Sequence, residues 1–145
     1  MAWQLRPCVD GDAHWIAELR ADVMRPDLER LGRFDPERVR RRFLAGFDAS
    51  STHVIEVATK PVGCIAVRRT PDAHRLEHFY LDATLQGQGI GTAVLSHVLA
   101  EHGPSATFRL NVLSGSPAQR LYARHSFTIE REDPIDVYMV RAPRP

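Results

Sequence analysis

The chain has little lysine, few cysteines and no long apolar run. Lys60 is the only lysine among 145 residues, and 19 basic against 18 acidic side chains leave a net charge of +1. A charge so near zero argues against a strong binder of nucleic acid or of membrane surfaces. No apolar run has the length of a transmembrane helix, and the amino terminus lacks the basic-then-apolar pattern of a secretory signal. We therefore expect neither nucleic acid nor a membrane as a partner.

The scarcity of cysteine also limits the metal sites and disulfides that the chain can form. Cys8 and Cys64 have neither the spacing of metal ligands nor the pattern of a disulfide framework. We expect both thiols to be reduced and to lie at or near the core of a cytoplasmic protein. Apart from His78, the histidines have no ligand spacing either, so the sequence predicts no metal site.

The first half of the chain predicts a strand, two helices and a β-hairpin within a single domain of residues 1–145. The strand covers residues 3–7, and the first helix follows a cap at Asp10 or Asp12 and ends at Arg25-Pro26. The second helix begins at Asp35, where an acceptor cap precedes a first-turn proline. The hairpin joins residues 52–59 to residues 62–69. The apolar stripes expected for the two helices are Ile16, Leu19, Val23 and Met24, and then Val39, Phe43, Leu44 and Phe47.

The second half alternates strands with helices. A strand over residues 74–81 leads through a glycine-rich turn into a helix that stops at Gly103-Pro104. A strand at 107–112, a short helix from Ser116-Pro117 and an antiparallel pair at 128–131 and 137–141 follow. The helical stripes expected here are Ile90, Val94, Leu95, Val98 and Leu99, and then Ala118, Leu121 and Tyr122. This order predicts an α+β fold whose mixed, mostly antiparallel sheet has about seven strands and about four flanking helices.

The glycine-rich turn Gln86-Gly87-Gln88-Gly89-Ile90-Gly91-Thr92 is the most informative stretch. Glycines allow a backbone to turn tightly and to approach a ligand closely. The first amides of the helix that follows have no intrahelical acceptor, and the helix dipole adds positive potential there. This arrangement favours a phosphate or pyrophosphate at the turn. The alternative is a glycine-rich turn that binds nothing.

Three phosphate-binding patterns compete for this turn. A nucleoside-triphosphate loop requires a lysine that is absent, and a dinucleotide fingerprint would place its last glycine at Thr92. The pattern Gln/Arg-x-x-Gly-x-Gly/Ala is matched at every fixed position by residues 86–91. On this match the sequence resembles the GNAT-type N-acetyltransferases, which bind the pyrophosphate of acetyl-CoA with this loop.

A second segment supports the resemblance. Ala118 to Phe127, AQRLYARHSF, is similar to the family pattern Ala-x-x-Leu-Tyr-x-x-x-Gly-Phe. Ser126 departs from the pattern, since glycine is usual there and a left-handed turn costs serine about 1 kcal/mol. Gly115 stands where the family often has an asparagine that orients the pantetheine arm, a role that Asn111, Ser114 or Ser116 would have to take over. The order of elements is also that of the GNAT fold, so the resemblance covers nearly the whole chain.

The resemblance implies a site between the strand before the glycine loop and the next strand. The backbone of Phe79 and Leu81 would bond the pantetheine and the acetyl carbonyl. Tyr122 would be the general acid that protonates the departing sulfur. The alternative is that Tyr122 is a core aromatic residue whose hydroxyl bonds to the backbone. The full set of cofactor-binding candidates is Phe79, Tyr80, Leu81, Gln86, Gly87, Gln88, Gly89, Ile90, Gly91, Thr92, Asn111, Ala118 and Tyr122.

The general base has three candidates: Glu77, His78 or a relay of water molecules. Strand alternation places the two side chains on opposite faces, so at most one of them is expected to face the acceptor. Each side chain also has a purely structural alternative. Glu77 would then be a solvated carboxylate paired with Arg75 or Arg109, and His78 would be a half-buried, hydrogen-bonded ring.

Residues 20–42 hold eight arginines and five acids. In the family this region forms one wall of the acceptor site, where arginines would hold a carboxylate or phosphate of the acceptor. A solvated, ion-paired helix face is the alternative, and it is favoured by the position of Arg38, Arg41 and Arg42 outside the apolar stripe.

Together these features predict an acetyl-CoA-dependent N-acetyltransferase that moves an acetyl group to a primary amine by direct attack. The acceptor would be a small molecule or a protein amino group. The alternative is a non-catalytic acyl-CoA-binding or sensor domain of the same fold. The resemblance also implies a possible homodimer through the two closing strands.

Overall fold

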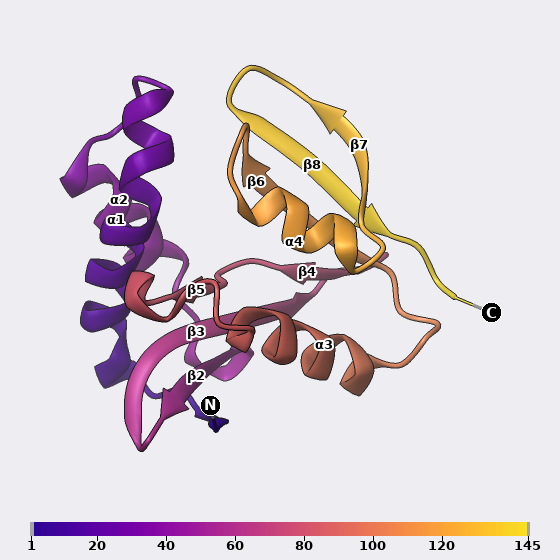
Figure 1. Ribbon diagram of the computed structural model, residues 1–145, viewed down its shortest axis with the longest axis horizontal. Helices are drawn as coiled ribbons and strands as arrows, with labels where there is room; N and C mark the ends of the chain where they lie inside the picture. Colours follow the sequence, from indigo (N-terminus) through magenta and orange to yellow (C-terminus); the bar gives the residue numbers. More distant parts are fainter. Residues whose placement is uncertain (1, 145) are drawn as a thin grey trace.

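A computed structural model of the protein describes residues 2–144. A mixed sheet of eight strands lies between two pairs of helices (Figure 1). The helices are α1 (Ala13–Arg30), α2 (Pro36–Gly46), α3 (Ile90–His102) and α4 (Ala118–Arg124). The strands are β1 (Trp3–Pro7), β2 (Thr52–Val57), β3 (Lys60–Arg69), β4 (His74–Leu76), β5 (Tyr80–Leu81), β6 (Phe108–Leu113), β7 (Thr128–Glu132) and β8 (Asp136–Arg141).

The strands follow the order β1-β2-β3-β4-β6-β8-β7, and β5 pairs with β3 alone. The pair formed by β4 and β6 is parallel, and the other described pairs are antiparallel. This parallel pair requires a crossover, which α3 supplies. The predicted hairpin and the predicted closing pair are both confirmed.

The prediction that the first helix ends at Arg25-Pro26 is wrong, because α1 continues to Arg30. Pro26 is exposed and its missing amide costs the helix one hydrogen bond, but Leu28 beyond it is buried and holds the last turn against the core. The helix ends at Arg30, and Gly32, two residues further on, has a φ of 69° that turns the chain so that Arg33 donates to the carbonyl of Leu28 at 2.8 Å. The buried stripe is Ile16, Ala17, Ala21 and Leu28, while Leu19, Val23 and Met24 are half-buried.

The second helix begins where it was expected. A carboxylate oxygen of Asp35 accepts the amides of Glu37 and Arg38, each at 3.1 Å, which satisfies two donors of the first turn. Val39 and Phe43 are buried as predicted. Two other residues of the predicted stripe are less buried than expected: Leu44 is exposed and Phe47 is half-buried.

The strand predicted at 74–81 is two strands, β4 and β5, separated by a bulge. Residues 77–79 lie opposite only Ile65 and Ala66 of β3. Ala66 bonds both sides of the bulge, accepting from the amide of Glu77 at 2.9 Å and donating to the carbonyl of His78 at 3.1 Å. Because β6 pairs with β4 and not with β5, the sheet opens between β5 and β6.

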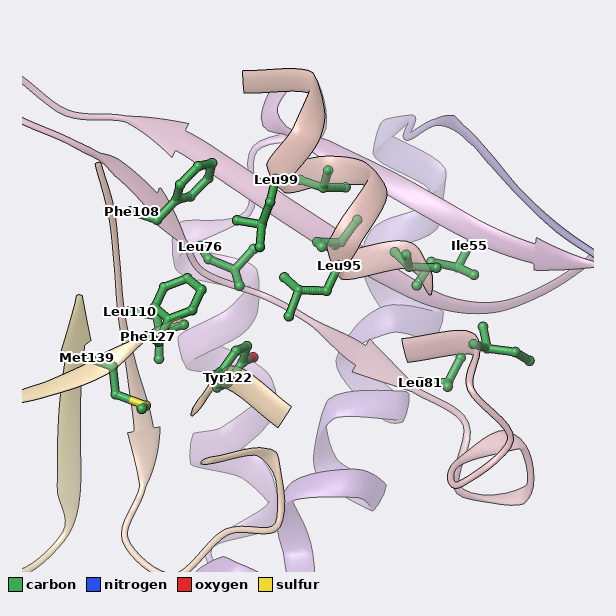
Figure 2. Close-up of a cluster of buried hydrophobic side chains, with 14 of the residues drawn as sticks. Ile55, Leu76, Leu81, Leu95, Leu99, Phe108, Leu110, Tyr122, Phe127 and Met139 are labelled. Atoms are coloured by element: carbon green, nitrogen blue, oxygen red, sulfur yellow. The ribbon is translucent and has the colours of Figure 1, made fainter. Parts of the chain in front are cut away.

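The two faces of the sheet carry separate clusters of apolar side chains. On one face, α3 and α4 pack over the larger cluster, where Figure 2 shows Leu95 and Leu99 reaching toward Leu76. On the other face, Ile16 and Phe43 of α1 and α2 pack on β2 and β3. Both cysteines are free thiols buried in this second cluster, as expected.

Gly63 is the residue that allows β5 to lie against β3. A Cβ at this position would lie 2.3 Å from the carbonyl oxygen of Tyr80 and 3.2 Å from the Cα of Leu81. Both of those atoms are backbone, so they can move away only if β5 itself shifts.

We therefore expect Gly63→Ala to lower the free energy of unfolding by about 1–3 kcal/mol, as overpacking of a core does. Urea denaturation followed by circular dichroism measures the change. Gly11→Ala is the matched control, because no atom lies within 4 Å of the added methyl. Equal stability of Gly63→Ala and the parent protein would show that β5 is not fixed by this contact.

Candidate functional site

A cleft of about 1490 Å³ occupies the opening between β5 and β6. Its walls come from both faces of the sheet: α1 and α2 on one side, and the glycine turn, α3 and α4 on the other. In Figure 1 the sheet divides at this point, with β5 on the side of α1 and β6 passing behind α4.

The amino-terminal end of α3 opens into this cleft without a capping side chain. Its N-cap residue, Gly89, has a φ of 85° and no side chain to accept an amide. The first intrahelical bond runs from Ala93 to the Gly89 carbonyl at 3.1 Å, so the amides of Ile90, Gly91 and Thr92 have no acceptor within the helix. In contrast with α2, which Asp35 caps, α3 presents free donors and the positive end of its dipole.

Glutamine side chains hold the glycine turn in place. Gln86 donates its side-chain amide to the Leu81 carbonyl at 2.9 Å, and Gln88 donates to the Thr84 carbonyl at 3.0 Å. The residues of the turn that line the cleft are Gln86, Gly87, Gly89, Gly91 and Thr92. Gln88 and Ile90 do not line it, because Gln88 folds back on the turn and Ile90 is 3% exposed in the core. Only the backbone of Gln88 and Ile90 therefore remains a candidate for contact with the cofactor.

Phe79, Tyr80 and Leu81 line the cleft, as the sequence predicted. The Tyr80 hydroxyl bonds to the Arg20 guanidinium and to Nδ1 of His78, each at 3.0 Å. Burial raises the pKa of Tyr80 to about 12. Arg20 belongs to the stretch 20–42 that the sequence offered as a wall of the acceptor site, but it was not singled out there. Its position four residues after Ile16 is the signal, because a charged residue on a buried helical stripe indicates function or pairing.

Glu77 and His78 both line the cleft, whereas simple alternation predicted opposite faces. The bulge accounts for the difference, because it interrupts the alternation at these residues. Glu77 is bound by Arg68 at 2.8 Å and lies 3.8 Å from Arg75. The His78 ring meets that of Phe43 edge to face at 4.9 Å. Burial, and then the positive charge of Arg20, lower its pKa to about 4, so this ring is neutral at neutral pH.

Tyr122 projects from α4 into the same cleft and is only 7% exposed. Its ring packs edge to face on Phe127, with ring centres 5.7 Å apart (Figure 2). Within residues 2–144 its hydroxyl makes no hydrogen bond, so the backbone partner expected of a core tyrosine is missing there, although the ring belongs to the larger apolar cluster. Burial raises the pKa of this hydroxyl well above its ordinary value.

Asn111 and Ala118 also line the cleft. The Asn111 side chain is already engaged, since it accepts from Arg75 and donates to Asp136 at 3.2 Å. Ser116, another possible substitute for the missing asparagine, accepts the amide of Ala118 at 3.3 Å.

The two departures from the family pattern have structural explanations. Gly115 has a φ of 79°, a conformation suited to glycine and asparagine, and the Arg30 guanidinium lies 2.9 Å from where its Cβ would be. Ser126 adopts the left-handed turn despite its side chain, with a φ of 71°. Phe127 donates to the Tyr122 carbonyl at 3.1 Å, so the helix-ending turn doubted from the sequence does form.

Comparisons with known proteins identify the family. The model of the acetyltransferase (GNAT) domain matches residues 48–129, more than half of the chain. The chain therefore belongs to the GNAT acetyltransferase family, and the resemblance drawn from the glycine loop is confirmed. No curated protein matches the sequence.

Solved structures share the fold at low sequence identity. The PaiA N-acetyltransferase of Thermoplasma acidophilum, in complex with coenzyme A, has a TM-score of 0.76 at 14% identity over 98% of this chain and 99% of its own. PH1933 of Pyrococcus horikoshii has a TM-score of 0.74 at 21% identity over 99% and 100%. A protein of Corynebacterium glutamicum described as histone acetyltransferase HPA2 and related acetyltransferase has a TM-score of 0.71 at 20% identity over 100% and 98%. The predicted GNAT fold is thus confirmed, with one more strand than expected because of the bulge.

No helix among residues 2–144 is both long and apolar enough to cross a membrane. The same residues contain no group of three or more His, Cys, Asp or Glu side chains that could hold a metal ion.

The strained turn after α4 gives a prediction about stability. Ser126→Gly should raise the free energy of unfolding by about 1 kcal/mol, because glycine adopts the left-handed conformation without steric cost. Thermal denaturation measures the gain. Ser105→Gly is the control, since Ser105 is an exposed turn residue without a positive φ and should gain nothing. A loss of stability in Ser126→Gly would mean that the bond between Ser126 and Arg144 outweighs the strain.

Proposed function

We propose that this protein is an acetyl-CoA-dependent N-acetyltransferase, which transfers the acetyl group to a primary amine by direct attack. The observation that carries the proposal is that the uncapped end of α3 opens into the same cleft as the hydroxyl of Tyr122, which has no hydrogen-bond partner within residues 2–144. The unpaired amides of α3 can donate to the diphosphate of the coenzyme, and the Tyr122 hydroxyl can donate a proton to its sulfur. The family membership and the coenzyme A found in the Thermoplasma relative support it.

The cleft fits the coenzyme on chemical grounds. The free amides of Ile90, Gly91 and Thr92 would donate to the diphosphate, and the glycines of the turn leave room for it. No acidic side chain lies in residues 83–92 to repel that charge. The pantetheine arm would then extend along the open edge of β5, where the backbone of Phe79 and Leu81 would orient the thioester.

Tyr122 would protonate the departing sulfur. The amine nitrogen attacks the acetyl carbonyl carbon, a carbon–nitrogen bond forms, and the carbon–sulfur bond breaks as the electron pair leaves on sulfur. Burial raises the pKa of Tyr122, so the hydroxyl holds its proton at neutral pH and would give it up only as negative charge develops on the departing sulfur beside it.

The amine must lose a proton, and we propose that it does so through water. Glu77 is already bound by Arg68, which weakens it as a base. His78 has a pKa of about 4 and its Nδ1 is engaged by Tyr80, so it also accepts a proton poorly. Both side chains line the cleft and would orient the relay.

Tyr122→Phe tests the assignment of the acid. Turnover should fall by about a hundredfold, in the range of lost general acid catalysis, while the affinity for acetyl-CoA stays unchanged. An amine panel with detection of free thiol measures turnover, and calorimetry measures affinity. Tyr138→Phe is the matched control, since Tyr138 lies on β8 and does not line the cleft.

Equal turnover in Tyr122→Phe and the parent protein would remove Tyr122 as the acid. Tight acetyl-CoA binding without turnover of any amine in the parent protein would favour the non-catalytic acyl-CoA-binding domain instead.

A further inference from the structure

Arginines outnumber acidic side chains among the residues that line the cleft. Seven arginines line the cleft against five acids. The arginines are Arg20, Arg33, Arg38, Arg42, Arg68, Arg75 and Arg124. Two of them, Arg38 and Arg42, are one helical turn apart on α2, and the next residue at that spacing, Gly46, also lines the cleft. This face of α2 therefore borders the cleft, and both arginine side chains are exposed, as the sequence favoured for a solvated face.

Neighbouring arginines of α2 behave differently. Arg40 points away from the cleft and binds both carboxylate oxygens of Glu18, at 2.7 and 2.9 Å. Arg41 is exposed and does not line the cleft. The direction of Arg38 and Arg42 is thus specific to those two positions and is not a property of the whole helix.

The acids of the cleft are already engaged by the chain itself. They are Asp27, Asp35, Glu77, Asp133 and Asp136. Asp27 pairs with Arg30 at 3.0 Å. Glu77 pairs with Arg68 at 2.8 Å. The other three accept hydrogen bonds from backbone or side-chain amides. Within residues 2–144, neither Arg38 nor Arg42 forms an ion pair, so their charges are available to a ligand.

Arg20 lies deeper in the same wall and also lacks a carboxylate partner among residues 2–144. It is half-buried and donates to two neutral oxygens, the Tyr80 hydroxyl at 3.0 Å and the Val39 carbonyl. A guanidinium partly removed from water without a counter-ion is costly, and an anionic ligand group would offset that cost. Val39 follows Arg38 in the chain, so Arg20 contacts the backbone of α2 next to Arg38, and all three arginines line the same cleft.

We propose that the acceptor carries an anionic group, a carboxylate or a phosphate, in addition to its amine, and that Arg38, Arg42 and Arg20 bind that group. The inference rests on the proposed acetyl transfer and names its substrate class. Arginine suits such groups because its planar fork donates two parallel hydrogen bonds. Arg20 reaches Tyr80 directly, so an anion held here stands beside the residues proposed to orient the thioester.

Matched amines test this selectivity. In each pair a neutral group replaces the anionic one: an amino acid against its carboxamide, and phosphoethanolamine against ethanolamine, compared at equal concentrations of the neutral amine. With free-thiol detection, the parent protein should prefer the anionic member of at least one type of pair by about tenfold to a hundredfold in kcat/KM, the range of charge-assisted hydrogen bonds. The type of pair that shows the preference distinguishes carboxylate from phosphate. No preference in either type overturns the proposal.

Charge-matched variants assign the preference to residues. R38Q/R42Q should bring the two members of the preferred pair to within about threefold of each other. R41Q/R120Q removes the same charge from exposed positions outside the cleft and should keep the preference. An unchanged preference in R38Q/R42Q overturns the assignment.

Coenzyme A titrations separate this proposal from the proposed function. Both double variants should bind coenzyme A as the parent protein does. Weaker binding in R38Q/R42Q alone would assign the two arginines to the coenzyme and overturn the proposal. Absence of binding in the folded parent protein would instead overturn the proposed acetyl transfer.

A direct binding measurement tests whether Arg38 and Arg42 bind an anion, even if no amine is acetylated. Inorganic phosphate and acetate are titrated into the protein while the arginine side-chain N–H signals are followed by NMR. Saturable shifts of the Arg38 and Arg42 signals with either anion, absent in the variant that lacks both, support the site. Linear or absent shifts with both anions overturn it.

Discussion

The separation of β5 from β6 is the constraint on which the rest of the structure depends. Three residues of the bulge face two residues of β3, and β5 therefore follows β3 while β6 continues beside β4. Gly63 permits this course because no side chain stands between β3 and β5. The opening exposes backbone that a continuous sheet would have paired. It also lets groups from both faces of the sheet reach one cleft, which no flat sheet allows.

Most of the fold could be predicted from the sequence, because most of its signals are local. The Asp35-Pro36 start of α2, the hairpin and the glycine turn each depend on a few neighbouring residues. The errors arose where packing overrides local preference. Pro26 is tolerated because Leu28 is buried beyond it, and the single strand at 74–81 is divided by its pairing with β3. Which strands of a sheet pair with one another cannot be predicted from a short window of sequence.

The candidate site was predicted in part for the same reason. The glycine turn and Tyr122 carry recognisable spacing, whereas the surroundings of Glu77, His78 and Arg20 come from three separate elements. Burial then changes two groups of the site: it lowers the pKa of His78, so that the ring is neutral at neutral pH, and it raises the pKa of Tyr122. The same reasoning applies to Arg38 and Arg42, whose direction toward the cleft depends on how α2 packs on α1 and could not be read from the charge pattern alone.

The account depends on an anion bound by the free amides at the start of α3, and two variants of its N-cap residue test this most directly. Gly89→Glu and Gly89→Gln impose the same strain at a φ of 85° and add side chains of similar size, but only glutamate adds a negative charge. Calorimetric titration with coenzyme A should show binding at least about tenfold weaker in Gly89→Glu than in Gly89→Gln, because like charges would meet there. Equal affinities in the two variants would place the diphosphate elsewhere and contradict the account.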